Sequence, residues 1–148
     1  MSLDSSADVL ALPRSSRAPA AARAHVASVL SGCPPDVRDT LLLAVSEAVT
    51  NAVRHGSGDV ALSVALNDDH VHVEVSDAGA GWSHLGRLSG HATADGSANG
   101  NGSANGDGLA EGGRGLPLIA ALTDAWGARA RAGAPGTTVW FDVRLPTG

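Results

Sequence analysis

The 148-residue sequence predicts an α+β protein: a two-layer α/β sandwich in which three helices lie on one face of a mostly antiparallel sheet. Three observations support this fold class. Two segments with helical periodicity lie in the first third of the chain. Two short strands with alternating apolar and polar residues then meet at a tight turn. A third helix and a second strand pair follow a long Gly-rich segment. The expected order is therefore strand, helix, helix, strand, strand, loop, helix, strand, strand.

The first half of the chain contains a short edge strand and two helices. Residues 9–12 form an apolar run that a proline ends, which is typical of an edge strand. A serine at 15–16 is expected to cap the first helix, which runs to about residue 30 before two prolines prevent its continuation. Asp36 is expected to cap the second helix, which ends at His55 and places Gly56 in the left-handed conformation.

The second half supplies the rest of the sheet. Apolar and polar residues alternate over 71–76 after the turn at 67–69, so we expect an antiparallel hairpin with one apolar face. Residues 86–112 are rich in Gly, Ser, Ala and Asn and are expected to form a flexible loop, because they bury too little apolar surface to fold. The domain is expected to span 8–148, after a flexible segment at 1–7. The other expected elements are strands at 60–66, 125–131 and 137–145, and a helix from about 113 to 123 or 124.

Composition excludes several classes of protein. The net charge of −5 gives no electrostatic support to direct binding of nucleic acid. All 10 basic residues are Arg, so a catalytic Lys is excluded. Cys33 is the only cysteine, which favours a reducing compartment. No apolar run reaches membrane-spanning length and the N-terminus lacks the pattern of a secretory signal, so we expect a cytoplasmic protein without a membrane partner.

Three polar residues, Glu47, Asn51 and His55, lie four positions apart and so share one stripe of the second helix. The amide oxygen of Asn51 is a hard ligand that suits Mg²⁺. The Glu47 carboxylate, one turn away, can orient or deprotonate a water or a hydroxyl group. His55 is interpreted as structural, because a positive charge is favourable near a helix C-terminus. Taken alone, the stripe is also typical of the exposed face of a surface helix.

Two glycine motifs add to this stripe. Asp77-x-Gly79-x-Gly81 follows a strand, where a carboxylate can accept a hydrogen bond from an exocyclic amine and glycine lets the backbone approach a flat ligand. The segment 113–116 opens the third helix, where free N–H groups bind phosphate and Arg114 can add a contact. Each motif is weak alone, because the first can be a simple hairpin exit and the second the end of the loop. Their joint occurrence around a long loop favours a nucleotide site.

Together these motifs resemble a known family. E-A-V-T-N-A-V-R-H-G resembles the N box of the GHKL superfamily of ATPases (gyrase, chaperone, histidine kinase and mismatch repair), which share the Bergerat fold. D-A-G-A-G and G-G-R-G-L-P-L-I resemble the two glycine boxes of that superfamily. The strand–helix start, the segment S-E-A-V-T-N-A-V-R-H-G and the ending D-A-W-G…G-T-T-V-W-F are more similar to its branch of anti-sigma-factor serine/threonine kinases. The resemblance covers about residues 9–145.

The resemblance implies roles for the candidate residues. Asn51 would coordinate Mg²⁺ between the ATP phosphates, and Glu47 would be the general base. Asp77 would accept the adenine amine, and Arg114 would act in catalysis at the phosphate end. The segment 86–112 takes the place of the ATP lid, but it is low in complexity rather than helix-forming. The residues that would bind the nucleotide are Asn51, Asp77, Gly79, Gly81, Gly113, Arg114, Gly115, Leu116 and Thr138, with Thr137 as the alternative to Thr138.

By the same resemblance, the protein is expected to be an ATP-dependent anti-sigma factor that phosphorylates an anti-anti-sigma (STAS-type) partner on Ser or Thr. The unphosphorylated partner would release a sigma factor, and the kinase is expected to be a homodimer. Two alternatives use the same residues: a binding module that regulates without phosphoryl transfer, and a slow ATPase with water as the nucleophile. The intact glycine boxes and Glu47 favour the kinase, whereas the low-complexity lid favours the binding module.

Overall fold

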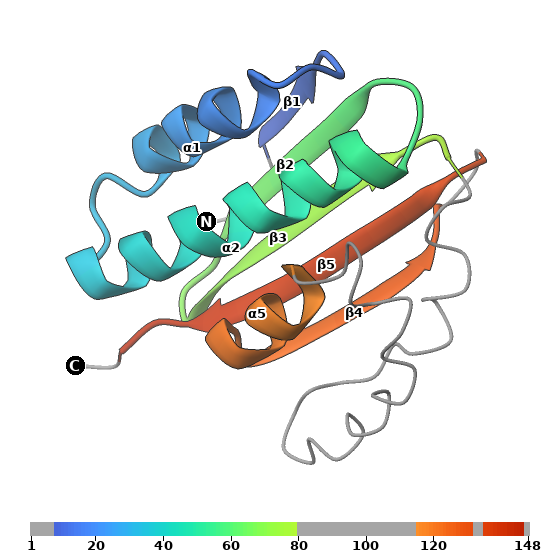
Figure 1. Ribbon diagram of the computed structural model, residues 1–148. Helices are drawn as coiled ribbons and strands as arrows, with labels where there is room; N and C mark the ends of the chain where they lie inside the picture. The colour runs from blue at the N-terminus through green and yellow to red at the C-terminus, as the bar shows by residue number, and fades with distance from the viewer. Residues whose placement is uncertain (1–7, 80–114, 132–134, 147–148) are drawn as a thin grey trace.

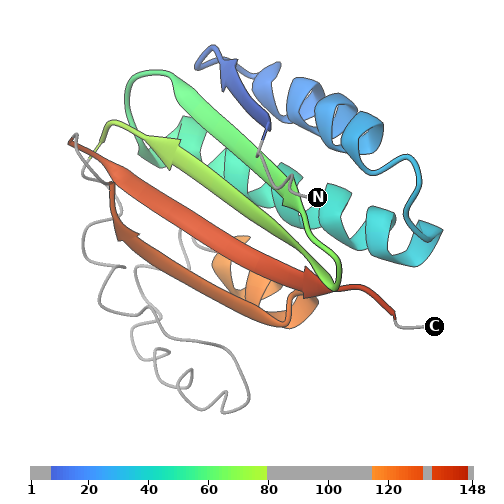
Figure 2. The ribbon, with the colours of Figure 1, turned by 180° about the vertical axis from the view of Figure 1, so that it is seen from behind.

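The computed structural model describes residues 8–79, 115–131 and 135–146. Within these ranges, five strands form one sheet and three helices pack on a single face of it, so the predicted two-layer sandwich is confirmed. Figure 1 shows the helices in front of the sheet, and Figure 2 shows that none of the described helices covers the other face, which is called the uncovered face below. In chain order the elements are β1 (Asp8–Leu12), α1 (Ala18–Val29), α2 (Pro35–His55), β2 (Val60–Leu66), β3 (His70–Asp77), α5 (Gly115–Leu122), β4 (Ala125–Ala130) and β5 (Thr137–Arg144).

The sheet has the strand order β1-β2-β3-β5-β4, and every neighbouring pair is antiparallel. β1 is an edge strand, as predicted from its short apolar run and the following proline. The hairpin of β2 and β3 is also confirmed, and Val64 lies opposite Val73. The chain then returns so that β5, rather than β4, pairs with β3 and places Thr137 opposite Asp77. This pairing brings the start of the last strand to the end of β3.

One apolar core lies between the sheet and the helices. Alternate residues of β2 and β3 are buried on the helix side, so the period of two in the sequence corresponds to the inner face of the sheet. α1 contributes small residues, Ala18 and Ala22, which allow it to pack closely on α2. Burial of each large apolar side chain contributes about 1.5–3 kcal/mol to folding. The largest fully buried side chains include Phe141, Leu30, Leu41, Leu62 and Ile119.

The ends of the first two helices differ from the sequence-based expectation. The Ser15 hydroxyl accepts a hydrogen bond from the Arg17 N–H, but Arg17 itself is the residue before α1 and provides no side-chain cap. α2 begins at Pro35, so Asp36 lies in its first turn rather than before it. Proline is well tolerated there because the first N–H groups of a helix have no intrahelical partner.

Gly56 is not left-handed, contrary to the prediction. Its φ of −98° and ψ of −160° are extended backbone, which any residue can adopt. The reason for glycine at this position is instead its close approach to another part of the chain, described below. The predicted flexible N-terminus at 1–7 and the predicted lid at 86–112 lie outside the described residues.

Among the described residues, no helix combines the length and the apolar character needed to cross a membrane.

Candidate functional site

The candidate site lies where three elements end or begin. The C-terminal end of α2, the end of β3 and the start of β5 meet at the right-hand side of the view in Figure 1. β3 ends at Asp77, and the turn after α2 bonds to the residue that follows, because the Ala78 N–H donates to the Ser57 carbonyl at 2.9 Å. The topology thus brings the N-box helix and the first glycine motif together, although they are more than 20 residues apart in the sequence.

Asp77 is the central polar group of this site. Its side chain is 2% exposed and points to the helix side of the sheet, in line with Val75 and Val73. The carboxylate Oδ1 accepts a hydrogen bond from the Gly79 N–H at 2.7 Å, and the backbone N–H of Ser57 also favours the charged form of this carboxylate. A carboxylate held by a backbone donor has a fixed orientation and retains lone pairs for a further donor.

Glycines surround Asp77 on several sides. A Cβ atom on Gly56 would lie less than 3.0 Å from the Asp77 carboxylate, which is closer than real Cβ atoms approach other groups. A Cβ on Gly79 would lie 2.7 Å from the Ser57 nitrogen. Gly136 has a φ of +133°, where a side chain is strained, and its Cβ would collide with the Asp77 carbonyl oxygen. Glycine at these positions therefore lets three backbone segments pack closely around Asp77.

The environment of Asp77 favours its neutral form. Burial raises the pKa of the carboxyl above its ordinary value of 3.8, although the N–H groups of Gly79 and Ser57 and the charges of Arg131 and Arg14 act in the opposite direction. A buried carboxylate with a raised pKa gains from any further donor that replaces lost water. The exocyclic amine of a purine base is such a donor.

Asn51 is the second buried polar residue of the site. Its side chain is 3% exposed, and its Nδ2 atom has no hydrogen-bond partner among the described residues. An unpaired buried amide costs about 1–3 kcal/mol, so its retention on an otherwise apolar helix face indicates a polar ligand. Rotation of the carboxamide exchanges its oxygen and nitrogen, so the same position can present an oxygen to a cation. The residues present therefore fit a bound polar group with an associated metal ion.

Glu47 lies one turn before Asn51 on α2 and is half-buried. Its position is compatible with contact to a ligand that also reaches Asn51, because residues four apart lie on the same helix face. His55 is the last residue of α2 and is exposed, which agrees with its interpretation as a helix-end residue. Of the three polar residues on this stripe of α2, Glu47 is therefore half-buried, Asn51 is buried and His55 is exposed.

The two candidate threonines lie on opposite faces of β5. Thr137 pairs with Asp77, so its side chain lies on the helix side, and its hydroxyl donates to the Gly79 carbonyl at 3.4 Å. Thr138 pairs with Ser76, and their hydroxyl oxygens are 2.7 Å apart. Both threonines are buried. The register therefore places the alternative candidate, Thr137, beside Asp77.

The phosphate-end candidates are described only in part. Gly115 and Leu116 are the first two residues of α5, and α5 packs against α2 and β4. The start of α5 therefore belongs to the same layer as the Asn51 helix. Gly81, Gly113 and Arg114 lie outside the described residues.

A groove among the described residues lies at the opposite end of the sheet, with a volume of about 570 Å³. It is lined by the turn before α2, the β2–β3 hairpin and the residues after β5. Of its lining side chains, Cys33 and Asp68 are ionisable, and burial raises the pKa of the Cys33 thiol, so this thiol is poorly nucleophilic. Position and chemistry therefore separate this groove from the candidate site.

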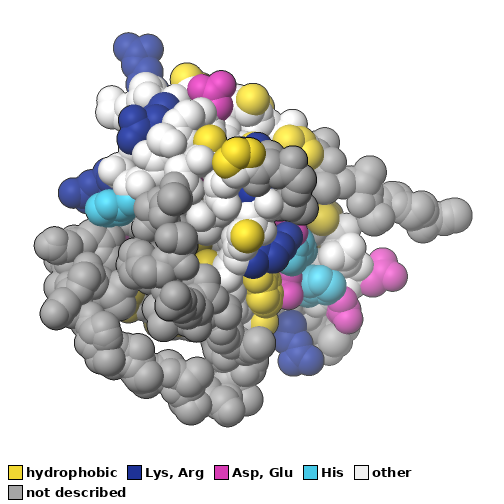
Figure 3. Space-filling model, turned by 90° about the vertical axis from the view of Figure 1, so that its right-hand side faces the viewer, with side chains coloured by type: hydrophobic (Ala, Val, Ile, Leu, Met, Phe, Trp, Pro, Cys, Tyr) yellow, Lys and Arg dark blue, Asp and Glu magenta, His cyan; other side chains and the backbone are white. Residues whose placement is uncertain are grey.

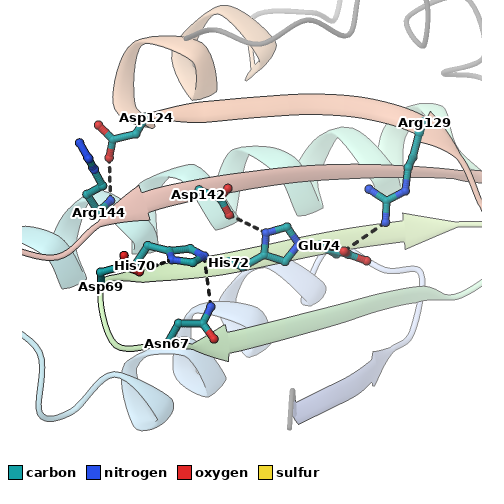
Figure 4. A network of polar contacts seen from close by, with 9 residues as sticks. All are labelled: Asn67, Asp69, His70, His72, Glu74, Asp124, Arg129, Asp142 and Arg144. Carbon is teal, nitrogen blue, oxygen red and sulfur yellow. Dashed lines mark hydrogen bonds and ion pairs between the residues drawn. The ribbon is translucent and has the colours of Figure 1, made fainter. Parts of the chain in front are cut away.

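A second polar cluster, not predicted from the sequence, lies on the uncovered face of the sheet (Figure 4). The two ring nitrogens of His72 lie 2.5 Å from Asp142 Oδ1 and 2.8 Å from Glu74 Oε2. Arg129 adds a contact of 3.1 Å to Glu74, and the His72 ring stacks on Trp140. Figure 3 looks at the end of the molecule where β3 ends, and histidine, acidic and arginine side chains gather on its right, where the uncovered face lies.

The network favours a charged imidazole. Burial of the His72 ring opposes protonation, but the hydrogen bonds to Glu74 and Asp142 outweigh it, so the pKa of His72 lies above its ordinary value of 6.5. The adjacent Trp140 indole covers Gly127, where a Cβ would lie 2.7 Å from its Nε1. This cluster links β3, β4 and β5 and lies on the other face of the sheet from Asp77.

The fold and the residues around Asp77 define a two-layer α/β domain with a candidate nucleotide site at the end of its long helix. The family model of the histidine kinase-like ATPase domain matches residues 12–143 of the chain. The chain therefore belongs to the histidine kinase-like ATPase domain family, within the GHKL-type superfamily, and is an ATP-binding domain. No curated protein matches the chain significantly.

Sequence reasoning missed part of this arrangement. It assigned no role to Arg14 and gave Gly56 only a helix-end role. The approach of Gly136 to Asp77 depends on the pairing of β3 with β5, and this pairing has no local signal in the sequence. The place of Gly56 at the end of the N box is visible in the sequence, but its contact with Asp77 is not.

Proposed function

We propose that this ATP-binding domain is an anti-sigma factor that acts as a serine/threonine kinase on an anti-anti-sigma partner of the STAS type. The observation that carries the proposal is the placement of Glu47 one turn before the buried amide of Asn51, on the helix that reaches Asp77; the Asn51 Nδ2 has no partner among the described residues. A carboxylate beside the phosphate end of the site is what transfer to a hydroxyl group requires. The segment S-E-A-V-T-N-A-V-R-H-G supports the assignment to this branch.

The chain's residues have distinct proposed tasks. Asp77 accepts the adenine amine, and Thr137, which lies opposite it, supports that end of the site in preference to Thr138. Glu47 orients the hydroxyl of the partner's Ser or Thr and accepts its proton. Arg114 stabilises the transferred phosphoryl group, a role that rests on its motif alone. The remaining proposed contacts are made by Gly79, Gly81, Gly113, Gly115 and Leu116.

Asn51 is the proposed Mg²⁺ ligand. Its buried amide fits this role because an oxygen at that position would be an uncharged hard ligand, and Mg²⁺ binds through few protein groups. When bound, Mg²⁺ would neutralise charge on the phosphate oxygens. The test is the ATP affinity with and without a chelator: the wild-type domain should lose most of its affinity when Mg²⁺ is removed, and Asn51→Ala should be insensitive to removal.

Two other functions are compatible with an ATP-binding site. The first is a regulatory module that binds ATP and a protein partner without phosphoryl transfer. The second is a slow ATPase in which water takes the place of the partner's hydroxyl. The partner assay below distinguishes them, because the first gives neither labelled partner nor free phosphate and the second gives free phosphate without any partner.

The kinase is tested with ATP labelled at the γ-phosphate and purified STAS-type proteins from the same organism. We expect label on a Ser or Thr of one of them. Glu47→Ala should bind ATP as the wild type does. It should transfer the label at least about 10²-fold more slowly, the usual effect of losing a general base. If no label reaches any partner while wild type and Glu47→Ala bind ATP equally, the kinase proposal is wrong.

The cellular setting is part of the same proposal. The partners are a sigma factor and a STAS-type protein, the active form is a homodimer, and the site of action is the cytoplasm, without contact to nucleic acid or membrane. The sequence features that support this are the net charge of −5 and the resemblance to the anti-sigma branch. Co-purification of the domain with the labelled STAS-type protein, followed by competition with sigma factors, tests the partner assignment.

A further inference from the structure

Arg14 lies in the connection between β1 and α1, and in the sequence it is far from the N box and the glycine motifs. Its side chain is exposed, and its Nη2 atom donates a hydrogen bond of 2.9 Å to the carbonyl oxygen of Gly56, which is 42 residues away in the sequence. Gly56 is the C-cap residue, directly after the last residue of α2. An Arg that reaches across the fold to one backbone carbonyl fixes that carbonyl more firmly than solvent would, because the bond is charge-assisted.

The segment that Arg14 holds is also in contact with Asp77. Gly56 faces the Asp77 carboxylate so closely that a Cβ would not fit between them. The carbonyl of the next residue, Ser57, accepts a hydrogen bond from the Ala78 N–H, which follows Asp77 directly. Gly56 and Ser57 therefore form one wall of the Asp77 site, and Arg14 is bonded to the Gly56 carbonyl in this wall.

We propose that Arg14 is a positioning residue for adenine recognition, which acts by holding the Gly56–Ser57 wall against the Asp77 carboxylate. The inference rests on the proposed role of Asp77 as the acceptor of the adenine amine. It assigns to the β1–α1 connection a part in choosing the base, a role that none of the sequence motifs indicates. The ligand class is a nucleotide whose base carries an exocyclic amine.

A second observation supports the same role. The positive charge of Arg14 acts on Asp77 and opposes the effect of burial on the pKa of this carboxyl. Arg14 therefore favours both the position and the ionised form of the acceptor. Arg131 also contributes charge, but among the described contacts its side chain does not bond to the Gly56–Ser57 wall. The hydrogen bond distinguishes Arg14 from a general source of positive charge.

The experiment compares Mg-ATP with Mg-ITP, in which a carbonyl replaces the exocyclic amine, by isothermal titration of the whole chain. Arg14→Met removes the donors and the charge but keeps the apolar part of the side chain, and Arg14→Lys keeps the charge and an N–H donor group. Arg17→Met is the matched control, because Arg17 is also exposed and its side chain makes none of the contacts described at the site. Circular dichroism and thermal melting establish that each variant is folded.

We expect Arg14→Met to weaken ATP binding by about 3- to 10-fold, the usual effect of one lost hydrogen bond, and to change ITP binding by less than about twofold. Arg14→Lys should recover most of the preference for ATP, and Arg17→Met should retain all of it. Equal losses for ATP and ITP, or no loss at all, would overturn the inference. Asp77→Asn separates the two levels: if it leaves the preference for ATP intact, the proposed role of Asp77 is wrong; if it removes the preference while Arg14→Met does not, only the role of Arg14 is wrong.

Discussion

A Cβ atom on Gly56 would lie less than 3.0 Å from Cγ and from both oxygens of the Asp77 carboxylate. The last residue of the N-box motif is therefore packed directly on the acidic residue of the first glycine motif. The two motifs are not independent contributors to a site, because the backbone of one defines the space that the side chain of the other occupies. Substitutions at Gly56 are expected to act through Asp77.

Gly56→Ala tests this packing. The new methyl group must displace either the carboxylate or the end of α2, and overpacking of this kind costs about 1–3 kcal/mol of stability. Displacement of Asp77 should also weaken Mg-ATP binding, by about tenfold for each 1.4 kcal/mol of lost interaction. Thermal unfolding and isothermal titration measure the two effects.

Gly32→Ala is the matched control, since a Cβ at that position meets no atom within 4 Å. It should leave ATP affinity unchanged and stability within about 0.5 kcal/mol of the wild type. If Gly56→Ala binds ATP as well as Gly32→Ala does, the contact with Asp77 has no part in nucleotide binding.

A second prediction concerns the effect of acid on ATP binding. Burial raises the pKa of Asp77 above its ordinary value of 3.8, and the ionised carboxylate is the form that accepts the adenine amine most strongly. On acidification, ATP affinity should therefore begin to decrease at a higher pH than it would if Asp77 were an exposed carboxyl with an ordinary pKa.

The contribution of Asp77 to the stability of the nucleotide-free protein has the opposite trend. Because the pKa of Asp77 is raised in the folded protein, this contribution is favourable at low pH and is lost as the pH rises through the folded pKa.

Isothermal titration with Mg-ATP between pH 5 and pH 8 measures this dependence. Asp77→Asn should bind ATP more weakly and lose most of the acid dependence, because the side chain no longer ionises. Asp59→Asn, which alters an exposed carboxyl before β2, should retain the wild-type profile. An unchanged acid dependence in Asp77→Asn would assign the titration to another group, such as the nucleotide phosphates.

The sequence predicted the element order and the fold class because the signals were local. The alternation over 71–76 and the helical period before Gly56 identify elements from neighbouring residues alone. The pairing of β3 with β5 has no such signal, since it joins residues between 60 (Asp77 and Thr137) and 74 (His70 and Arg144) positions apart. The register of this β3–β5 pairing decides whether Thr137 or Thr138 lies beside Asp77. The site was therefore predicted as a list of residue types, and its geometry came from the strand register.

The charged cluster on the uncovered face illustrates the same limit. The alternation over 71–76 predicts His72 and Glu74 only as polar positions of a strand, and both lie at such positions of β3. Their partner Asp142 lies 70 residues from His72, and the contact between them depends on the β3–β5 register. A polar residue on an outer face is predicted as exposed, whereas pairing across strands makes these side chains half-buried and mutually dependent.

A third prediction is that His72 makes stability depend on pH near neutrality. Since the pKa of His72 is higher in the folded than in the unfolded chain, its stabilising effect is complete below the unfolded value of about 6.5 and is lost as the pH rises through the folded pKa. The groups that face the ring are Asp142, Glu74 and Trp140, with Arg129 behind Glu74. The effect is expected to be about 1 kcal/mol, because the network is only partly buried.

Urea unfolding at pH 6 and pH 9 measures this effect. The wild type should lose about 1 kcal/mol more than His72→Gln between these two values. His55→Gln is the control, because His55 is exposed at the end of α2 and should leave the difference unchanged. The prediction does not hold if His72→Gln shows the wild-type loss of stability.

The last prediction concerns Asn51, whose role in binding opposes its effect on stability. Its buried Nδ2 has no partner among the described residues, so an apolar side chain of similar size removes an unsatisfied group. Asn51→Leu should therefore abolish Mg-ATP binding, while the stability of the nucleotide-free protein stays the same or rises by about 1 kcal/mol. Such an opposition between binding and stability is typical of functional sites.

Asn67→Leu is the control variant, because the Asn67 amide lies 3.2 Å from His70 Nε2, and losing this bond should lower stability without changing the affinity for ATP. Chemical unfolding without nucleotide, together with titration of Mg-ATP, gives both quantities. A loss of stability in Asn51→Leu as large as in Asn67→Leu would mean that the Asn51 amide serves the fold rather than a ligand.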